Sequence, residues 1–453
     1  MRIDSVSFLV ALYAIPGQLA AAAITLNLDD DESIKQAAGR AAYDMMTYYT
    51  GNETGDVPGN LPDPYYWFGS LINYWYYTGD TTYNEIVTQG LLHQAGMEHD
   101  FMPTNQSKTL GNDDQAFWGM AAMTAAETGF ADPPDDQPGW LALAQTVFET
   151  QKPRWDNSSC GGGLRWQIFP FNTGYNYKNS ISNGGYFNLA ARLALYSGNQ
   201  SYADEAVKTW DWMWNVGYIK HDTYHIIDGA HNTDNCTGMD GNTWTFSGLS
   251  DNSGIFLLGA SAMYNYTNGS DIWRDRVDNL LAAGQKFFID KVMYEGCEAA
   301  QCNVDQRSFK AYYTRWLAAT AELVPYTHDN IIEEFRASAL AAVQTCTAGD
   351  TGTACGLRWT ERVNDGSLGV GEQMAVMEIF QSNLVDKAPG WKSEVKGTGT
   401  SKGDANAGNT VTSDTERLSG SEVTTADRIG AGILTAMVLI GVIGASVLML
   451  ISE

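Results

Sequence analysis

The chain has 453 residues, of which 27 are Lys or Arg and 53 are Asp or Glu, so its net charge at pH 7 is −26. Such acidity repels a phosphate backbone, which excludes nucleic acid as an expected partner and is typical of a protein soluble outside the cell. The hydrophobic share of 44%, with 14 Trp and 23 Tyr, is sufficient for one large core.

The first 23 residues have the pattern of a secretory signal peptide. Arg2 gives a positive start, residues 6–15 are mostly apolar, and residues 20–22 are three alanines that suit signal peptidase. Asp4 departs from this pattern, but the apolar stretch is too short to indicate a membrane span. We therefore expect residues 1–23 to be removed.

Residues 24–390 are predicted to form one domain, because no linker rich in Pro, Ser or Gly interrupts them. A capping box at residues 33–36 opens the first helix, and Ile34, Ala37, Ala41 and Met45 share one helical face. Few convincing strands are visible, so the predicted class is all-α. Further helical runs are predicted at 68–77, 82–95, 114–127, 140–152, 184–196, 203–216, 254–266, 272–288, 308–324, 330–346 and 370–384.

A turn pattern recurs between these predicted helices. The segments at 77–80, 196–199 and 266–269 each end a helix at Gly or Asn, and an aromatic residue opens the next helix. One helix pair plus one long loop accounts for the spacing of roughly 50–70 residues. Five or six such hairpins closing on themselves form an (α/α)6 barrel. An open solenoid is the alternative, but its terminal repeats should look like polar caps, and these do not.

Asp113 and Asp114 are adjacent carboxylates at the predicted start of a helix. A helix N-terminus favours negative charge, so the pair could serve only as a helix cap. Glycoside hydrolysis also needs two carboxyl groups, about 5–5.5 Å apart in a retaining enzyme, and neighbouring helical residues can supply that spacing. Both readings are compatible with the dipeptide alone.

The long loops contain flat rings beside amides and cations, a composition that suits a polyhydroxylated ligand. The segments 164–167 and 174–179 place Trp166, Tyr175, Tyr177 and Asn179 in such surroundings. The sequence has no GxSxG elbow, Walker A motif or GxGxxG after a strand, and no cofactor is expected.

A metal site is also not expected. His221, His225 and His231 share a loop with Asp222 and Asp228, but their spacing lacks the helical i, i+4 placement of a zinc enzyme. Solvated loop histidines are the favoured interpretation.

Six cysteines and seven sequons agree with secretion. Cys297 and Cys302 can close a small loop, Cys346 and Cys355 bracket a turn, and Cys160 pairs with Cys236 by elimination. A zinc site has little support because no CxxC pair is present. Asn-x-Ser/Thr acceptors stand at Asn52, Asn105, Asn157, Asn199, Asn235, Asn265 and Asn268.

The C-terminal part changes composition after Trp391. Residues 391–428 are rich in Gly, Ser, Thr, Lys and Asp and are predicted to be a flexible stalk, followed by an apolar tail at 429–453. Small residues, a short polar spacer and a terminal apolar tail form a GPI signal, with Ser419 or Gly420 as the expected attachment residue. A retained membrane helix is the alternative, although no basic cluster follows the tail. Attachment near 406–408 is a further alternative.

Several segments together resemble glycoside hydrolase family 76, and within it the fungal, GPI-anchored mannan endo-1,6-alpha-mannosidases. The resemblance runs from about residue 26 to 384 and rests on the segments 113–119, 162–167, 177–184, 228–231 and 309–312. It implies an (α/α)6 barrel and retaining, endo-acting hydrolysis of alpha-1,6-mannosidic bonds in mannan or GPI-type glycans, serving cell-wall biogenesis. It also implies that Asp113 is the nucleophile and Asp114 the acid/base. The side chains expected to contact sugar are Trp67, Trp118, Trp166, Tyr175, Tyr177, Asn179, Asp228 and Trp244.

The resemblance leaves two alternatives for function. The fungal branch is also thought to act as a transglycosylase that joins GPI-protein glycans to wall beta-glucan. A non-catalytic mannan-binding wall protein that keeps the aspartates for glycan contacts is the second alternative. In each case the expected location is the outer face of the plasma membrane or the cell wall.

Two positions depart from the family pattern. Residues 247–251 look like an insertion beside the cleft, which would alter the local site geometry. Gly185 stands where fungal relatives often have Cys, so the resemblance does not identify the partner of Cys160.

Overall fold

The computed structural model describes residues 24–49, 65–238 and 249–409, together with 411–414, 417, 435 and 437–439. Within these residues no helix is sufficiently long and apolar to span a bilayer. The α-helices are α1 (Asp31–Met46), α2 (Tyr65–Thr78), α3 (Asn84–Ala95), α4 (Asn112–Thr128), α5 (Trp140–Gln151), α6 (Ser180–Ser197), α7 (Gln200–Asn215), α8 (Ser250–Tyr266), α9 (Asp271–Gly284), α10 (Phe309–Leu323), α11 (His328–Ala342) and α12 (Val370–Gln381).

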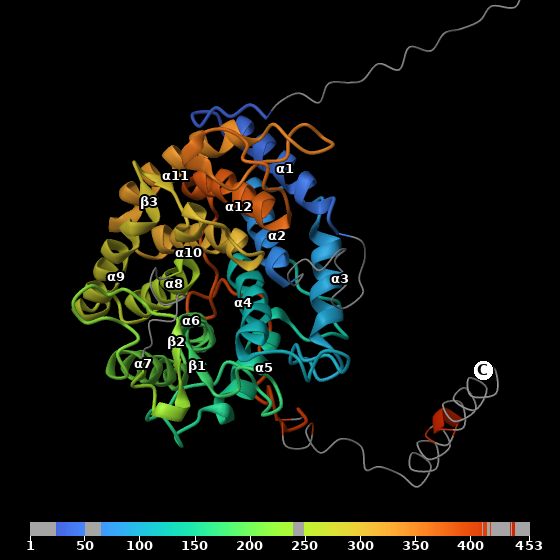
Figure 1. Ribbon diagram of the computed structural model, residues 1–453, viewed down its shortest axis with the longest axis vertical. Coiled ribbons are helices and arrows are strands. Elements are labelled where there is room, and N and C mark those ends of the chain that lie inside the picture. The colour runs from blue at the N-terminus through green and yellow to red at the C-terminus, as the bar shows by residue number, and fades with distance from the viewer. Residues whose placement is uncertain are drawn as a thin grey trace, which may run out of the picture.

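The even-numbered helices form a closed inner ring. Each of α2, α4, α6, α8 and α10 packs against the next even-numbered helix, and α12 packs back against α2. The odd-numbered helices lie outside this ring, and the chain travels once around it from blue to red (Figure 1). The predicted (α/α)6 barrel is therefore confirmed.

Burial separates the two rings as the sequence pattern requires. The inner helix α4 buries every residue from Gln115 onward, and α12 buries all of its residues. The outer helix α7 buries one stripe that includes Tyr202, Trp210 and Met213. A helix that is enclosed on all sides can be apolar all round, whereas a surface helix needs only one apolar face.

The predicted turn pattern is also present. α4 ends at Gly129 with φ 71° and α6 ends at Gly198 with φ 71°, both in the left-handed region that ends a helix at little cost for glycine. The next helix along the chain is an outer one in both cases, so the turns return the chain from the inner ring to the outer ring.

Short strands and 3-10 helices occupy the loops between helices. β1 (Tyr177–Asn179) pairs antiparallel with β2 (Gly229–His231), and β3 (Phe288–Ile289) pairs with β4 (Val292–Met293). The 3-10 helices are η1 (Lys152–Arg154), η2 (Asn232–Asp234), η3 (Gln285–Phe287), η4 (Gly296–Ala299), η5 (Asp305–Ser308), η6 (Pro325–Thr327), η7 (Val343–Thr345), η8 (Trp359–Glu361) and η9 (Ser382–Lys387).

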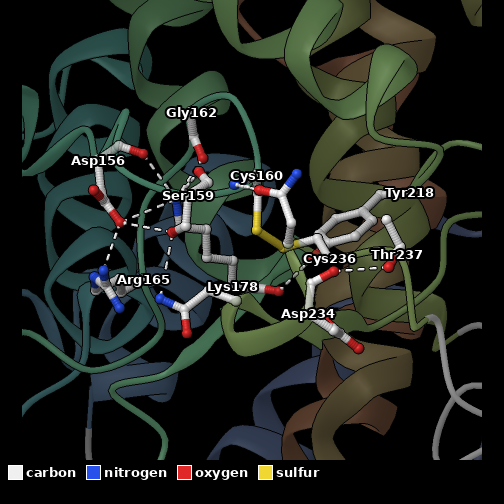
Figure 2. Close-up of a disulfide and its surroundings, with 12 residues drawn as sticks. Asp156, Ser159, Cys160, Gly162, Arg165, Lys178, Tyr218, Asp234, Cys236 and Thr237 are labelled. Carbon is white, nitrogen blue, oxygen red and sulfur yellow. Dashed lines mark hydrogen bonds and ion pairs between the residues drawn. A yellow bond between two sulfur atoms is a disulfide. The ribbon is translucent and has the colours of Figure 1, made fainter.

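Three disulfides are present, and they are the three expected pairs: Cys160–Cys236, Cys297–Cys302 and Cys346–Cys355. The first joins the loop after η1 to the loop after β2 (Figure 2). Gly185 has no room for a side chain, because a Cβ there would lie 2.5 Å from Cβ of Ala116.

Lys178 reinforces the same loop from beneath (Figure 2). Its buried ammonium donates to the carbonyls of Asp156, Ser159 and Gly162 at 2.8, 2.9 and 2.6 Å, and it forms an ion pair with the Asp156 carboxylate at 3.2 Å. This lysine of the 177–184 segment therefore holds loop structure rather than facing a ligand.

The stalk prediction is wrong for residues 391–409 and for 412, 414 and 417, which pack on the helical domain. The Lys392 amide donates to the Glu127 carbonyl at 2.6 Å, and the Leu141 amide donates to Ser401 Oγ at 3.1 Å. The Asp404 amide donates to Gln145 Oε1 at 2.8 Å. Short polar residues bind the helix ends through such hydrogen bonds, which a composition typical of linkers does not reveal.

Several predictions fall on residues that the structure does not describe. These are the signal peptide at 1–23, Asn52, Trp244, and the attachment residues Ser419 and Gly420. Among the described sequons, Asn105, Asn157, Asn199, Asn235 and Asn268 are exposed. Asn265 differs, because it is half-buried and its Nδ2 donates to the Leu323 carbonyl at 3.0 Å.

Candidate active site

The two adjacent aspartates lie in the first turn of α4, as the sequence predicts. Gly111 is the N-cap residue, and its amide donates to Asp114 Oδ2 at 2.6 Å. A side chain at Gly111 would collide with the pair, because a Cβ there would lie 2.3 Å from Asp113 Oδ1 and 3.1 Å from the Trp166 carbonyl. The helix start and the glycine before it thus bring the two carboxyl groups together.

The loop at 164–167 is bonded directly to this helix start. The Asn112 amide donates to the Trp166 carbonyl at 2.9 Å, and Asn112 Nδ2 donates to the Arg165 carbonyl at 2.9 Å. The Trp166 indole N–H donates to Asp113 Oδ2 at 2.9 Å. Backbone contacts and one side-chain contact therefore fix the ring of Trp166 against Asp113.

Asp113 has a perturbed acidity. Burial raises the pKa of its carboxyl well above the usual range, and the negative charge of Asp114 raises it further. Backbone N–H groups and the Trp166 indole oppose this rise in pKa by stabilising the ionised form. Two interacting carboxyls titrate as a pair, so one proton shared between them at working pH supplies both a base form and an acid form.

Asp113 opens into a pocket of about 260 Å³. Its described lining contains four aspartates and no lysine or arginine. Rings of Phe117, Trp166, Tyr177, Phe309 and Tyr312 supply the apolar faces of the walls. Apolar faces with convergent oxygen acceptors suit a sugar, which presents both C–H faces and hydroxyl donors. The full lining is Asp113, Phe117, Trp166, Tyr177, Asn179, Ile181, Asp228, Leu249, Asp251, Asn252, Asn303, Asp305, Gln306, Ser308, Phe309 and Tyr312.

The ribbon of β1 and β2 brings three predicted residues into this pocket. Tyr177 lies opposite His231 and Asn179 opposite Gly229, so Asp228 stands directly beside the ribbon. The Tyr177 hydroxyl donates to Asp228 Oδ2 at 2.7 Å. Burial raises the pKa of Asp228, while the hydrogen bonds from Tyr177 and Asn252 lower it. Asn179 is also the N-cap of α6, since its Oδ1 accepts from the Ser182 amide at 3.3 Å.

Asp251 was not singled out from the sequence, although it lines the same pocket. Its side chain is 5% exposed and Oδ1 has no hydrogen-bond partner among the described residues. Burial and the nearby charges of Glu295 and Asp228 raise the pKa of Asp251 well above its usual range. Ser250 and Asp251 begin α8, so this part of the apparent insertion is integral to the barrel. The prediction from sequence missed Asp251 as a pocket residue. The available signal was an acidic residue in the first turn of an apolar helix, as at Asp113.

Three predicted contact residues lie elsewhere. Trp67 is 2% exposed against the edge of Tyr49, and Trp118 is 1% exposed and stacked on Phe101 with ring centroids 5.6 Å apart. Both belong to the hydrophobic core, so the prediction that they stack on sugar is corrected. The ring of Tyr175 is covered by the Arg165 guanidinium at 4.5 Å and lines a separate cavity. Aromatic residues are used both for core packing and for stacking on sugars, so the residue type alone could not separate the two roles for these side chains.

The loop histidines make structural contacts. His221 stacks on Trp214 with ring centroids 4.2 Å apart, and its Nε2 lies 2.8 Å from the Trp214 carbonyl. His231 lies edge-on to Tyr177 at 5.1 Å. Across the part of the chain that the structure describes, no three His, Cys, Asp or Glu side chains are grouped to hold a metal ion.

Comparison with known proteins agrees with this geometry. The model of glycosyl hydrolase family 76 matches residues 33–394. The mannan endo-1,6-alpha-mannosidase DCW1 of Saccharomyces cerevisiae is 45% identical over 434 residues, which are 94% of each chain. A putative mannan endo-1,6-alpha-mannosidase of Schizosaccharomyces pombe is 41% identical and covers 86% of this chain and 88% of its own.

Solved structures show the same fold. Dfg5 from Chaetomium thermophilum, solved in complex with glucosamine, is 44% identical with a TM-score of 0.78, covering 84% of this chain and 97% of its own. A Salegentibacter alpha-1,6-mannanase has a TM-score of 0.59 at 18% identity, covering 77% of this chain and 98% of its own. The chain belongs to glycosyl hydrolase family 76 and is a glycosidase.

Proposed function

We propose that the protein is a retaining, endo-acting hydrolase of alpha-1,6-mannosidic bonds, with Asp113 as nucleophile and Asp114 as acid/base. The observation that carries the proposal is the position of Asp113, which lines an aromatic-walled pocket while Asp114 stands one residue further along the same helical turn. The curated relatives named above carry this activity in their names, which supports the choice of substrate.

The two carboxyls have different surroundings, which suits different roles. Asp113 borders the pocket and accepts from Trp166, and this hydrogen bond offsets part of the rise in pKa that burial and Asp114 cause, which favours the anion needed for attack on the anomeric carbon. Asp114 accepts from the Gly111 amide and is next to Asp113. During glycosyl transfer to Asp113, a proton on Asp114 passes to the departing glycosidic oxygen. In the second half, Asp114 takes a proton from the incoming hydroxyl.

Trapping with a mannosyl fluoride tests these roles. We expect a covalent mannosyl adduct on the peptide that contains Asp113, and none in Asp113→Asn. Asp114→Asn should still form the adduct with the fluoride, because fluoride leaves without help from an acid, but should turn over mannan at least about 1,000-fold more slowly. Release of product from mannan with no adduct at Asp113 would reject the nucleophile assignment.

A GPI-type glycan is a second candidate substrate, favoured by the charge of the pocket. Its described lining has Asp113, Asp228, Asp251 and Asp305 without a compensating lysine or arginine. Burial raises the pKa of Asp113, Asp228 and Asp251, and the ammonium group of an unacetylated amino sugar would favour their ionised forms and pair with them. The Chaetomium thermophilum relative was solved in complex with glucosamine, which is an amino sugar of this kind. Competition between glucosamine and N-acetylglucosamine as inhibitors tests this, since only the former carries the charge.

Hydrolysis and transglycosylation differ in what captures the glycosyl-enzyme. The rings of Phe309 and Tyr312 line the pocket, and such apolar walls would favour capture by a sugar acceptor over capture by water. Incubation of the enzyme with an alpha-1,6-mannan donor and labelled beta-glucan separates the two. Label in a mannan–glucan product supports the transglycosylase, whereas free mannosides alone support the hydrolase. Binding with neither product supports a non-catalytic wall protein.

We further propose that the chain is secreted and GPI-anchored at the outer membrane face or in the wall. The support is sequence alone: a signal pattern at 1–23, small residues at Ser419 and Gly420, and an apolar tail at 429–453. Phospholipase treatment specific for phosphatidylinositol should release the protein from membranes. Retention of the tail peptide in protein extracted with detergent would instead identify a membrane helix.

A further inference from the structure

The residues on either side of the aspartate pair are held by one arginine. Arg154, in η1, donates through Nη1 to Asn112 Oδ1 at 3.0 Å and to Gln115 Oε1 at 2.5 Å. Asn112 precedes Asp113, and Gln115 follows Asp114. One guanidinium therefore spans the four-residue turn that carries both carboxyl groups.

The other side of this guanidinium is bound by the C-terminal segment. Arg154 Nε and Nη2 donate to the two oxygens of Asp414 at 2.7 and 3.1 Å, a bidentate arrangement. The arginine side chain is 9% exposed and the aspartate 28% exposed, so the pair is shielded from much of the solvent. Asp414 lies 20 residues beyond the last residue that the family model matches, which is 394.

A second arginine of the same segment reaches the same turn from another direction. Arg417 Nη2 donates to Asp100 Oδ2 at 2.7 Å, and Arg417 also pairs with Glu98. The Asp100 carbonyl accepts from Gln115 Nε2 at 2.7 Å. Gln115 is therefore linked to Asp414 through Arg154, and to Arg417 through Asp100.

We propose that Arg154 is a positioning residue for Asp113 and Asp114, and that Asp414 and Arg417 hold this arrangement from the C-terminal segment. The inference rests on the proposed function, because it assigns the two aspartates to catalysis. The C-terminal segment therefore contributes to the turnover number through Asp414 and Arg417.

The physical reason is the sensitivity of glycosyl transfer to geometry. Displacement of a reacting group by about 1 Å can cost about 100-fold in rate. Without Asp414 the guanidinium of Arg154 keeps its neutral acceptors but loses its only described carboxylate partner, so its plane is less well fixed. The pocket walls do not include Arg154, Asp414 or Arg417, so substrate affinity should not change.

Steady-state kinetics of the full-length chain in detergent, with alpha-1,6-mannotetraose as the probe, tests the inference. Asp414→Asn and Arg417→Gln should each lower kcat about three- to tenfold with KM within twofold of the wild type. Asp414→Glu keeps the charge and should recover most of kcat. Asp404→Asn is the matched control, because Asp404 lies in the same segment and, among the residues that the structure describes, its side chain accepts from the nearby Asn406 amide and does not contact Arg154 or Gln115.

The outcomes separate this inference from the proposed function. Thermal unfolding midpoints within about 2 °C of the wild type show that a lower kcat is not a loss of fold. Equal kcat in Asp414→Asn, Arg417→Gln and Asp404→Asn, or an effect on KM alone, would overturn the positioning role while leaving the catalytic assignment intact. No turnover by the wild type would reject the proposed function itself, and the inference with it.

Discussion

The Trp166 indole N–H donates a hydrogen bond of 2.9 Å to Oδ2 of Asp113, so a pocket wall also controls the acidity of the expected nucleophile. A donor to the charged form lowers the pKa of a carboxyl. Here it opposes burial and the Asp114 charge, which both raise that pKa. The same ring therefore shapes the pocket and favours the ionised form required for attack.

Trp166→Phe keeps an aromatic wall and removes this donor. We expect the pKa of Asp113 to rise, so the acidic limb of the pH profile of kcat/KM moves to higher pH. The loss should lower kcat about 10- to 100-fold at its optimum, as expected for a hydrogen bond to a charged group. Trp214→Phe is the control, since Trp214 stacks on His221 away from the pocket. An unmoved acidic limb would contradict the role given to Trp166.

Replacement of Asp251 by Ala should have opposite effects on activity and stability. Its Oδ1 is buried without a partner among the described residues, which is costly for the folded state. We expect Asp251→Ala to lower kcat/KM for alpha-1,6-mannotetraose about tenfold, because a pocket acceptor is lost, and to raise the unfolding temperature. Measurement of both properties on one preparation checks this.

Exposed Asp305, at the rim of the same pocket, provides the comparison for Asp251. Asp305→Ala removes an exposed pocket carboxyl and relieves no buried charge, so it should not raise the unfolding temperature. A lower unfolding temperature in Asp251→Ala would show that this acid serves the fold rather than the ligand.

The parts of the site that the sequence could predict are local. The N-terminal turn of α4 follows from a cap residue, two acids and an apolar run, and these place Asp113 and Asp114 without tertiary information. The glycines that end α4 and α6 are likewise local signals, and their repetition indicated a ring of hairpins.

The remaining features depend on contacts between distant residues. Tyr177 and Asp228 meet because β1 pairs with β2. Each strand has three residues, which is too short for an alternating pattern that would identify a strand from sequence. Trp118 has the same local composition as a sugar platform, and the packing of Phe101 and Phe68 against its ring places it in the core. The attachment of residues 391–409 relies on hydrogen bonds that backbone groups make with distant backbone and side-chain atoms, which composition does not reveal.

The disulfides should differ in their value for stability. Cys160 and Cys236 are 76 residues apart, whereas Cys297 and Cys302 are 5 apart. The loop-closure model gives about 4–5 kcal/mol for the long loop and about 2 kcal/mol for the short one. We expect replacement of Cys160 and Cys236 by Ser to lower the free energy of unfolding by the larger amount.

The long-range disulfide should also affect activity, because it anchors the loop after β2 near the ribbon that presents Asp228 (Figure 2). The double variant is expected to raise KM for mannotetraose at a temperature where it remains folded. Replacement of Cys297 and Cys302 is the control for a generic loss of cross-linking. Equal effects of the two double variants on KM would show that the long-range disulfide has no specific role at the site.

Glu322 on α10 should make the barrel less stable as pH rises. Burial raises the pKa of its carboxyl to about 7, although the hydroxyls of Tyr76 and Tyr77 donate to it at 2.8 and 3.0 Å. Between the ordinary pKa of 4.5 and this value, the folded state binds a proton that the unfolded state has released. The free energy of unfolding therefore falls as pH rises through that window, by at most about 3 kcal/mol from this residue.

Glu322→Gln keeps a neutral acceptor for both tyrosines and removes the titration. Relative to the wild type, we expect its free energy of unfolding to depend less on pH between 4.5 and 7, with the larger gain in stability at the neutral end. Denaturant unfolding at pH 5 and 7.5 measures this difference. Glu333→Gln is the control, because that side chain is 61% exposed. Parallel pH dependence in Glu322→Gln and the wild type would mean that Glu322 does not titrate in this window.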